Sequence, residues 1–198
     1  MPEISKAKVV ILATHGFEQS ELEVPLQRLR HAGAEVVVVS PEKGQIRGWK
    51  EKDWGDSVNV DKAIAEVSAD DYDAIVLPGG QINPDLLRVN AEALQLIRDF
   101  LDSGKVVAAV CHAPWLLIEV DAVRGRRVTS YNSIKTDVIN AGGKWLDREV
   151  VTDSGLITSR NPDDLEAFCV TIVDEIEEGS HAQQRAAKGK GEQPPARH

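Results

Sequence analysis

The chain has 198 residues, the size of a single domain with one sizeable core. Its formal net charge of −9 argues against a nucleic-acid-binding surface, because neutralising phosphates requires clustered lysine and arginine. No apolar run is long enough to span a bilayer and the first residues lead straight into a strand, so we expect a cytoplasmic protein with no membrane segment and no signal peptide.

Few residues favour a metal, a disulfide or a cofactor. The two cysteines, Cys111 and Cys169, do not form the close pairs that zinc sites or redox motifs need. His15 and His31 have no partner at metal-ligand spacing. The glycine pair at 79–80 lacks the spacing of a dinucleotide loop and the lysine of a phosphate-binding loop. We therefore expect neither a metal nor another cofactor.

Apolar runs and helical periodicity alternate along the chain. Buried strands are predicted at residues 8–13, 35–40, 73–78, 106–110, 128–130 and 156–159, with part of a strand or hairpin within 145–152. Helices are predicted from near residue 18 to 33, at 91–102, from 114, at 133–141 and from 162 to 179, with a short one at 63–67. Residues 41–57 read as an irregular excursion or short hairpin.

This alternation predicts one α/β domain over residues 1–179, with a mainly parallel, doubly wound sheet and helices on both faces. Residues 180–198 are polar and too poor in apolar surface to order, so we expect a disordered polar tail. Parallel sheets bind ligands at the carboxyl ends of their strands. The loops after Ala13, Pro78 and Val110 are therefore expected to line one pocket.

Cys111 is the strongest candidate for chemistry. It stands between a buried strand and the helix expected to start at Pro114, where the helix N-terminus would stabilise a thiolate and lower the thiol pKa. The pattern favours a nucleophile over an inert core thiol. For Cys169 the pattern favours a packing role over a nucleophile, because this cysteine lies beside Phe168 in an apolar helix.

His112 follows the cysteine directly. Its pKa suits a general base for the thiol and a general acid for a leaving group, although adjacent side chains meet only at a sharp elbow. A histidine that merely satisfies the turn is the alternative. Asp85 is available as the orienting carboxylate, but Asn83-Pro84-Asp85 is also an ordinary helix start.

Glu18, Gly79 and Gly80 belong to loops at the same strand ends. A protonated Glu18 carboxyl would hydrogen-bond the cysteine sulfur, whereas spacing alone favours a negative charge that stabilises a helix N-terminus. Gly79 and Gly80 would offer backbone N–H groups to an oxyanion. A tight turn explains the two glycines equally well.

Several motifs together resemble the PfpI family of intracellular cysteine peptidases and deglycases, in the class I glutamine-amidotransferase-like superfamily. The motifs are Gly16-Phe17-Glu18, Pro78-Gly79-Gly80, Ala109-Val110-Cys111-His112-Ala113-Pro114 and Thr158-Ser159-Arg160. The resemblance covers residues 8–178 and implies a flavodoxin-like fold. It also implies a nucleophile at Cys111, a base at His112, a hydrogen-bonding carboxyl at Glu18, and oxyanion donors from Gly79, Gly80 and the elbow backbone.

In PfpI-like proteins a neighbouring subunit supplies the acid of the triad, and here that acid falls on Asp85. The resemblance therefore implies a homodimer or higher oligomer with the active site at the subunit interface. The leading hypothesis is a stress-protective cysteine hydrolase acting on glycated proteins, small aldehydes or peptides. A redox sensor or holdase chaperone that works through oxidation of Cys111 is the alternative, and a non-catalytic binding protein is a third.

Overall fold

The computed structural model of the chain describes residues 2–179 and 181. The strands of its main sheet are β1 Lys8–Leu12, β3 Glu35–Ser40, β6 Lys62–Ala63, β7 Ala74–Leu77, β8 Val106–Val110, β11 Val150–Asp153 and β12 Leu156–Ser159. They lie in the order β11-β12-β8-β7-β1-β3-β6, and only the β11–β12 pair is antiparallel. The prediction of an α/β fold with a mainly parallel sheet is confirmed. The central strands are apolar throughout because helices cover both of their faces.

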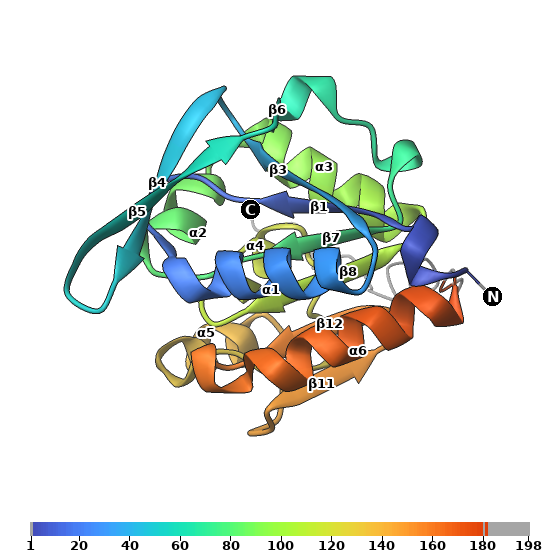
Figure 1. The fold of residues 1–198 in the computed structure, drawn as a ribbon. Coiled ribbons are helices and arrows are strands. Elements are labelled where there is room, and N and C mark those ends of the chain that lie inside the picture. Colours follow the sequence, from blue (N-terminus) through green and yellow to red (C-terminus); the bar gives the residue numbers. More distant parts are fainter. Residues whose placement is uncertain (1, 180, 182–198) are drawn as a thin grey trace.

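Helices cover the two faces of this sheet in separate groups. The α-helices are α1 Gln19–His31, α2 Ile82–Leu87, α3 Ala91–Asp102, α4 Pro114–Glu119, α5 Lys135–Asn140 and α6 Leu165–Glu178. Helices α1 and α6 lie together on one face, in front of the sheet in Figure 1, and α3 lies on the other. Short 3-10 turns are η1 Ile4–Lys6, η2 Ile64–Glu66, η3 Ala69–Asp71, η4 Asn132–Ile134 and η5 Pro162–Asp164. The short helix predicted at 63–67 is thus a single 3-10 turn.

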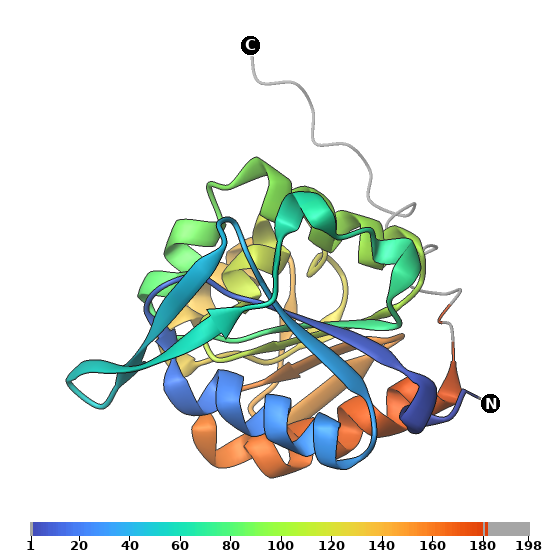
Figure 2. The same cartoon turned by 45° about the horizontal axis from the view of Figure 1, so that its top comes forward.

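Of the two alternatives predicted at 41–57, an irregular excursion or a short hairpin, the structure has a hairpin, and it is a long one. Strands β4 Gly44–Lys50 and β5 Asp53–Val60 pair antiparallel, and β2 Phe17–Glu18 joins them through β4. Charged residues and glycines interrupt the alternation that would have predicted these strands. The hairpin extends away from the body of the molecule (Figures 1 and 2). A further short pair, β9 Arg127–Val128 with β10 Lys144–Trp145, forms beside α5.

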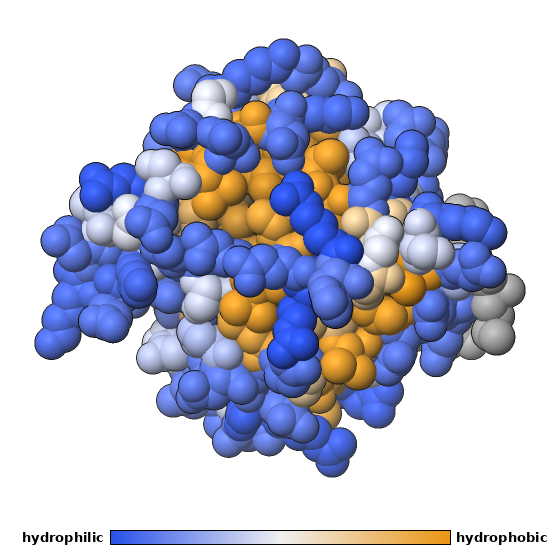
Figure 3. Space-filling model, in the orientation of Figure 1, coloured by the Kyte–Doolittle hydropathy of each residue, from blue (hydrophilic) through white to orange (hydrophobic). Residues whose placement is uncertain are grey.

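The surface in the view of Figure 1 is mostly polar. Figure 3 shows apolar side chains gathered on this face around the β3–β6 edge of the sheet, interrupted by polar ones. Val37 of β3 and Val67 after η2 pack there, partly exposed, against the core. Within residues 2–179 and 181, none of the helices combines the length and apolarity needed to cross a membrane. The tail predicted at 180–198 lies outside the described residues, apart from His181.

The register of the central strands brings the candidate residues to one edge. Strands β1, β7 and β8 are parallel and adjacent, so the loops after them leave the sheet side by side. These carboxyl ends point toward the side of the molecule where α2 and the β4–β5 hairpin lie (Figure 1). Cys111 follows β8 directly, Gly79 and Gly80 follow β7, and Glu18 precedes α1. The candidate site is therefore built from loops that the sheet holds in place.

Candidate active site

Cys111 occupies a sharp elbow between β8 and α4. Its φ is +64°, a left-handed conformation that an L-residue other than glycine seldom adopts. Both backbone groups of Cys111 are bonded: its N–H donates to the Ser159 carbonyl at 3.1 Å, and its carbonyl accepts from the Tyr131 N–H at 2.8 Å. Helix α4 begins at Pro114, as predicted. The surrounding chain thus holds the strained cysteine at the carboxyl end of β8, which is the geometry of a nucleophile elbow.

The elbow brings two adjacent side chains into contact. Cys111 Sγ lies 3.1 Å from His112 Nδ1, although neighbouring side chains normally diverge. The His112 ring also stacks on Tyr131, with centroids 4.8 Å apart, and meets the edge of Trp115 at 5.3 Å. Burial lowers the pKa of His112, so the ring is held as a neutral base beside the thiol.

Ser133 is the second hydrogen-bonding partner of His112, and no sequence signal distinguishes it from neighbouring polar residues. Its Oγ lies 3.1 Å from His112 Nε2. A tautomer protonated at Nε2 donates to Ser133 and leaves Nδ1 free to accept the thiol proton. Asp85, predicted to orient the histidine, is not among the hydrogen-bond partners of His112 in the described chain. It instead lines a separate shallow cavity with exposed residues of α2, because that helix carries it to the surface.

The carboxyl against the cysteine belongs to Glu21, which corrects the prediction for Glu18. Glu18 is the N-cap residue of α1, half-buried, and its carboxylate accepts from the Ser20 hydroxyl at 3.4 Å. Glu21 lies in the first helical turn, fully buried, and its carboxyl interacts with the Cys111 thiol. The signal for Glu21 was its place on the inward face of α1, four residues before the buried Pro25.

Burial changes the protonation of Glu21. Removal from water raises the pKa of Glu21 from about 4.5 to about 8, although an N–H donor and the thiol oppose the shift. Its Oε2 accepts from the Gly79 N–H at 2.8 Å. Oε1 is left without a hydrogen-bond partner from the rest of the described chain. At neutral pH this carboxyl is therefore mainly protonated beside the sulfur.

The two positions after β7 require glycine because other atoms of the chain approach their backbone too closely to leave room for a Cβ. A Cβ on Gly79 would lie 2.6 Å from Glu21 Oε2 and 2.7 Å from the Cys111 Cβ. A Cβ on Gly80 would lie 2.6 Å from the Gly16 carbonyl, and the φ of Gly80 is +78°. The Gly79 N–H is already bonded to Glu21, so Gly79 does not offer the free donor that the sequence suggested. The N–H groups of Gly80 and His112 instead point to the sulfur.

The surroundings of Cys111 shift the thiol pKa upward, opposite to the lowering predicted from the helix N-terminus. Burial raises the pKa of Cys111 above its ordinary value, and a charged Glu21 raises it further. Helix α4, whose N-terminus was expected to lower that pKa, has only six residues. The N–H groups of Gly80 and His112 oppose the shift. Burial therefore favours the neutral form of the thiol, which lies against the His112 ring.

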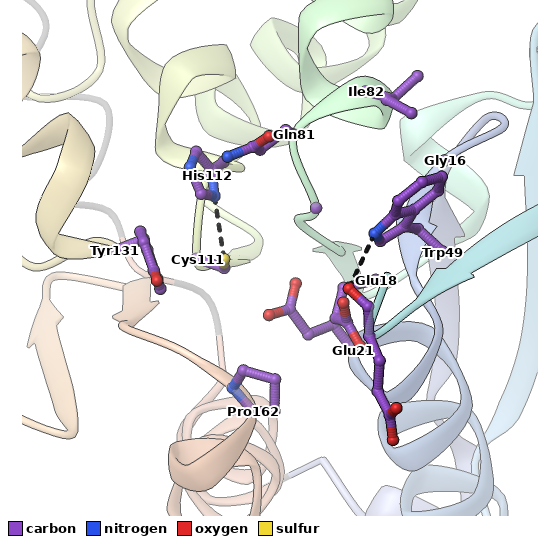
Figure 4. A pocket seen from close by; sticks show the side chains of 12 residues that line it. Gly16, Glu18, Glu21, Trp49, Gln81, Ile82, Cys111, His112, Tyr131 and Pro162 are labelled. Carbon is purple, nitrogen blue, oxygen red and sulfur yellow. Dashed lines mark hydrogen bonds between the residues drawn. The ribbon is translucent and has the colours of Figure 1, made fainter. Parts of the chain in front are cut away.

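A cavity of about 570 Å³ opens in front of the cysteine. Figure 4 shows Cys111 and His112 facing Glu18 and Glu21 across it, with Trp49 and Tyr131 among the side chains around them. The volume suits a small molecule or one amino-acid side chain. In residues 2–179 and 181, no group of three or more histidine, cysteine or acidic side chains is placed to hold a metal ion. Cys169 is buried in α6, near the charged side chains of Arg28 and Glu166.

The fold and this site define a flavodoxin-like α/β protein with a cysteine at a strand-to-helix elbow. The chain belongs to the DJ-1/PfpI family, whose model matches residues 7–175. Deglycase PfpI of Pyrococcus furiosus is 44% identical over 166 residues, which cover 84% of this chain and 97% of that protein. Protein/nucleic acid deglycase 2 of Escherichia coli is 45% identical over 163 residues, covering 81% and 92%.

A solved structure with two domains extends this similarity to three dimensions. The Anabaena variabilis protein with DJ-1/ThiJ/PfpI-like and ferritin-like domains has a TM-score of 0.82 and 38% identity to this chain. The match covers 87% of this chain and 48% of that one. The resemblance found in the sequence motifs is thus confirmed at the level of the family and the fold.

Proposed function

We propose that this protein is a stress-protective cysteine hydrolase that removes carbonyl adducts from proteins or cleaves small carbonyl and peptide substrates. The observation that carries the proposal is the 3.1 Å contact between Cys111 Sγ and His112 Nδ1 on a strained elbow facing a cavity. The relatives named as deglycases support the hydrolase over the redox or holdase alternative.

Catalysis would begin with a carbonyl group seated in front of Cys111. The sulfur attacks the carbonyl carbon while His112 Nδ1 takes the thiol proton, and Ser133 stabilises the imidazolium through Nε2. The N–H groups of Gly80 and His112 stabilise the oxyanion that forms. A neutral Glu21 keeps a second negative charge away from the sulfur.

His112 then returns its proton to the amine that leaves. In an acyl-type substrate the C–N bond breaks and a thioester remains, which water hydrolyses with His112 as the base. In a glycated amine the thiol displaces the amine to form a hemithioacetal. A proton shift between its two carbons gives a thioester, and water releases the hydroxy acid. Both routes restore the thiol and need no cofactor.

A second copy of the chain completes this proposal. Asp85 lines its shallow cavity together with the exposed Ile82 and Leu86 and with Trp115, whose ring meets His112. This apolar surface beside the active site suits a homodimer or higher oligomer, in which Asp85 of one copy serves the histidine of another. Measuring turnover and oligomeric state in Asp85→Asn tests this step. A fully active oligomer in that variant would remove Asp85 from the mechanism.

The central test compares wild type, Cys111→Ser and Cys169→Ser. Turnover of methylglyoxal and of peptides is measured with the oligomeric state determined in parallel. Only Cys111→Ser is expected to lose turnover, because Cys169 lies away from the cavity lining. Equal turnover in wild type and Cys111→Ser would overturn the nucleophile. A mass increase at Cys111 under mild peroxide with no turnover of any substrate would support the redox alternative instead.

A further inference from the structure

One aromatic neighbour of His112 has no part in the proposed catalytic steps. Trp115 is the second residue of α4, and its backbone N–H donates to the His112 carbonyl at 3.0 Å, so a tight turn places the two side chains together. The two rings meet edge-on, with centroids 5.3 Å apart and planes at 62°, an arrangement that aromatic pairs favour. Within the described chain, Trp115 lies outside the lining of the cavity in front of Cys111. It therefore contacts the base and not the place where a substrate would sit.

Three helices fix the indole of Trp115. Its Nε1 donates to the Asp137 carboxylate of α5 at 2.8 Å. The guanidinium of Arg88, at the end of α2, lies over the ring at 5.1 Å from its centroid. Glu119 of α4 holds that guanidinium by accepting from Nε at 2.9 Å and from Nη2 at 2.6 Å. The position of the ring is therefore set by α2, α4 and α5 together.

The other side chains around the His112 ring come from a more exposed part of the chain. Tyr131 stacks on the ring and Ser133 meets Nε2, but both belong to the exposed segment 131–133. Trp115, in contrast, is half-buried and hydrogen-bonded. This support matters because Nδ1 lies 3.1 Å from the thiol of an adjacent residue, and adjacent side chains normally diverge. A ring that turned freely would lose the thiol and Ser133 together.

From these contacts we infer that Trp115 is a positioning residue for the general base: its ring, fixed by Asp137 and Arg88, holds His112 where Nδ1 faces the thiol. Trp115 takes no proton and acts only through the histidine. This inference rests on the proposed function, because it concerns the base of that reaction. The alternative is that Trp115 only packs α4 against α2 and α5, in which case its loss changes stability without moving His112.

Two variants of Trp115 and one of Asp137 separate these roles. Trp115→Phe keeps an aromatic ring but loses the indole N–H, and Trp115→Leu removes the ring. Asp137→Ala removes the acceptor that fixes the indole. Because Asp137 is exposed and alanine favours a helix, this variant keeps the fold even if Trp115→Leu does not.

Trp145→Leu is the matched control. Trp145 is also half-buried, its indole Nε1 donates to the Ser130 hydroxyl at 3.0 Å, and the Lys135 ammonium lies over its ring at 4.7 Å. In the described chain, Trp145 makes no ring contact with His112. The control therefore loses an indole with the same kinds of partner but without the contact to the base.

Nuclear magnetic resonance of isotope-labelled histidine observes the base without any substrate. Burial keeps the pKa of His112 below its ordinary value, so at about pH 8 the ring is neutral. Long-range proton–nitrogen correlation then gives the ratio of its two tautomers. A His112→Gln sample assigns the signals, and the exposed His31 is the internal reference for a ring in water.

In wild type we expect the tautomer with hydrogen on Nε2 to dominate, because Ser133 accepts from Nε2 and the thiol donates to Nδ1. The ratio should fall about 2- to 10-fold in Trp115→Leu, toward that of His31, because an aromatic pair contributes about this much. It should fall less in Trp115→Phe and Asp137→Ala and stay unchanged in Trp145→Leu. An unchanged ratio in every folded variant of Trp115 and Asp137, or an equal fall in Trp145→Leu, would overturn the positioning role.

Turnover of methylglyoxal gives a second readout. Because Trp115 lies outside the cavity lining, Trp115→Leu should lower kcat about 2- to 10-fold and leave KM unchanged, and Trp115→Phe should restore most of kcat. If wild type turns over neither methylglyoxal nor peptides, the proposed hydrolase fails, and the tautomer ratio still decides whether Trp115 positions His112. If wild type is active and Trp115→Leu keeps both its kcat and its tautomer ratio, the hydrolase stands and the positioning role fails.

Discussion

Replacing Glu21 with glutamine should remove a specific pH dependence of stability. Glutamine keeps the shape of the protonated carboxyl and its acceptor for the Gly79 N–H, but does not ionise. In the native protein the pKa of Glu21 is about 8, against about 4.5 when exposed. Between these values the native state binds the proton more tightly, so this group makes the protein less stable as pH rises.

The size of the effect follows from the shift. A pKa unit corresponds to about 1.4 kcal/mol, so ionising Glu21 in the fold removes on the order of 5 kcal/mol across that range. Urea unfolding at intervals from pH 5 to pH 9 measures it. The difference between wild type and Glu21→Gln isolates the group, because the other titrations are common to both. Its stabilising contribution is fully present below about pH 4.5 and fully lost above about pH 8.

Glu23→Gln is the matched control, since Glu23 lies on the same helix and is only half-buried. In Glu23→Gln, the free energy of unfolding should change with pH as it does in the wild type. If the free energies of unfolding of wild type and Glu21→Gln changed with pH in the same way, the claim that Glu21 is buried and protonated would be refuted. The same reasoning predicts that activity declines as pH rises through about 8, because a charged Glu21 opposes negative charge on the sulfur.

Three further outcomes follow from the elbow and its neighbours. In urea unfolding, Cys111→Gly should have a free energy of unfolding about 1 kcal/mol higher than Cys111→Ala, because glycine adopts the positive φ without strain. Equal unfolding midpoints for the two variants would show that the backbone at this position is not strained. Ser133→Ala should lower kcat/KM about tenfold through loss of one hydrogen bond to His112, with an altered pH profile; an unchanged profile would leave Ser133 a structural role. Gly79→Ala should destabilise the fold by about 1–3 kcal/mol in thermal or urea unfolding, since its Cβ would meet Glu21 and Cys111; wild-type stability would contradict the close packing.

Much of the fold was predictable because its signals are local. The continuous apolar runs of β1, β7 and β8 require burial on both faces, and the inward stripes of α3 and α6 require a sheet to cover. The proline at the start of α4 marked the helix after the cysteine. The β4–β5 hairpin was less visible, since glycines and charges break its alternation and pairing with β2 supplies its register.

The sequence by itself determined that Cys111 and His112 would stand at a strand-to-helix junction, because the residues on both sides carry clear strand and helix signals. Only the tertiary structure decided what surrounds them. Glu21 rather than Glu18 meets the thiol, since the angle at which α1 packs on the sheet selects which carboxyl is buried. Ser133 reaches His112 from a 3-10 turn 21 residues away. Protonation likewise depends on burial and neighbouring charge, which arise only when distant segments are packed together.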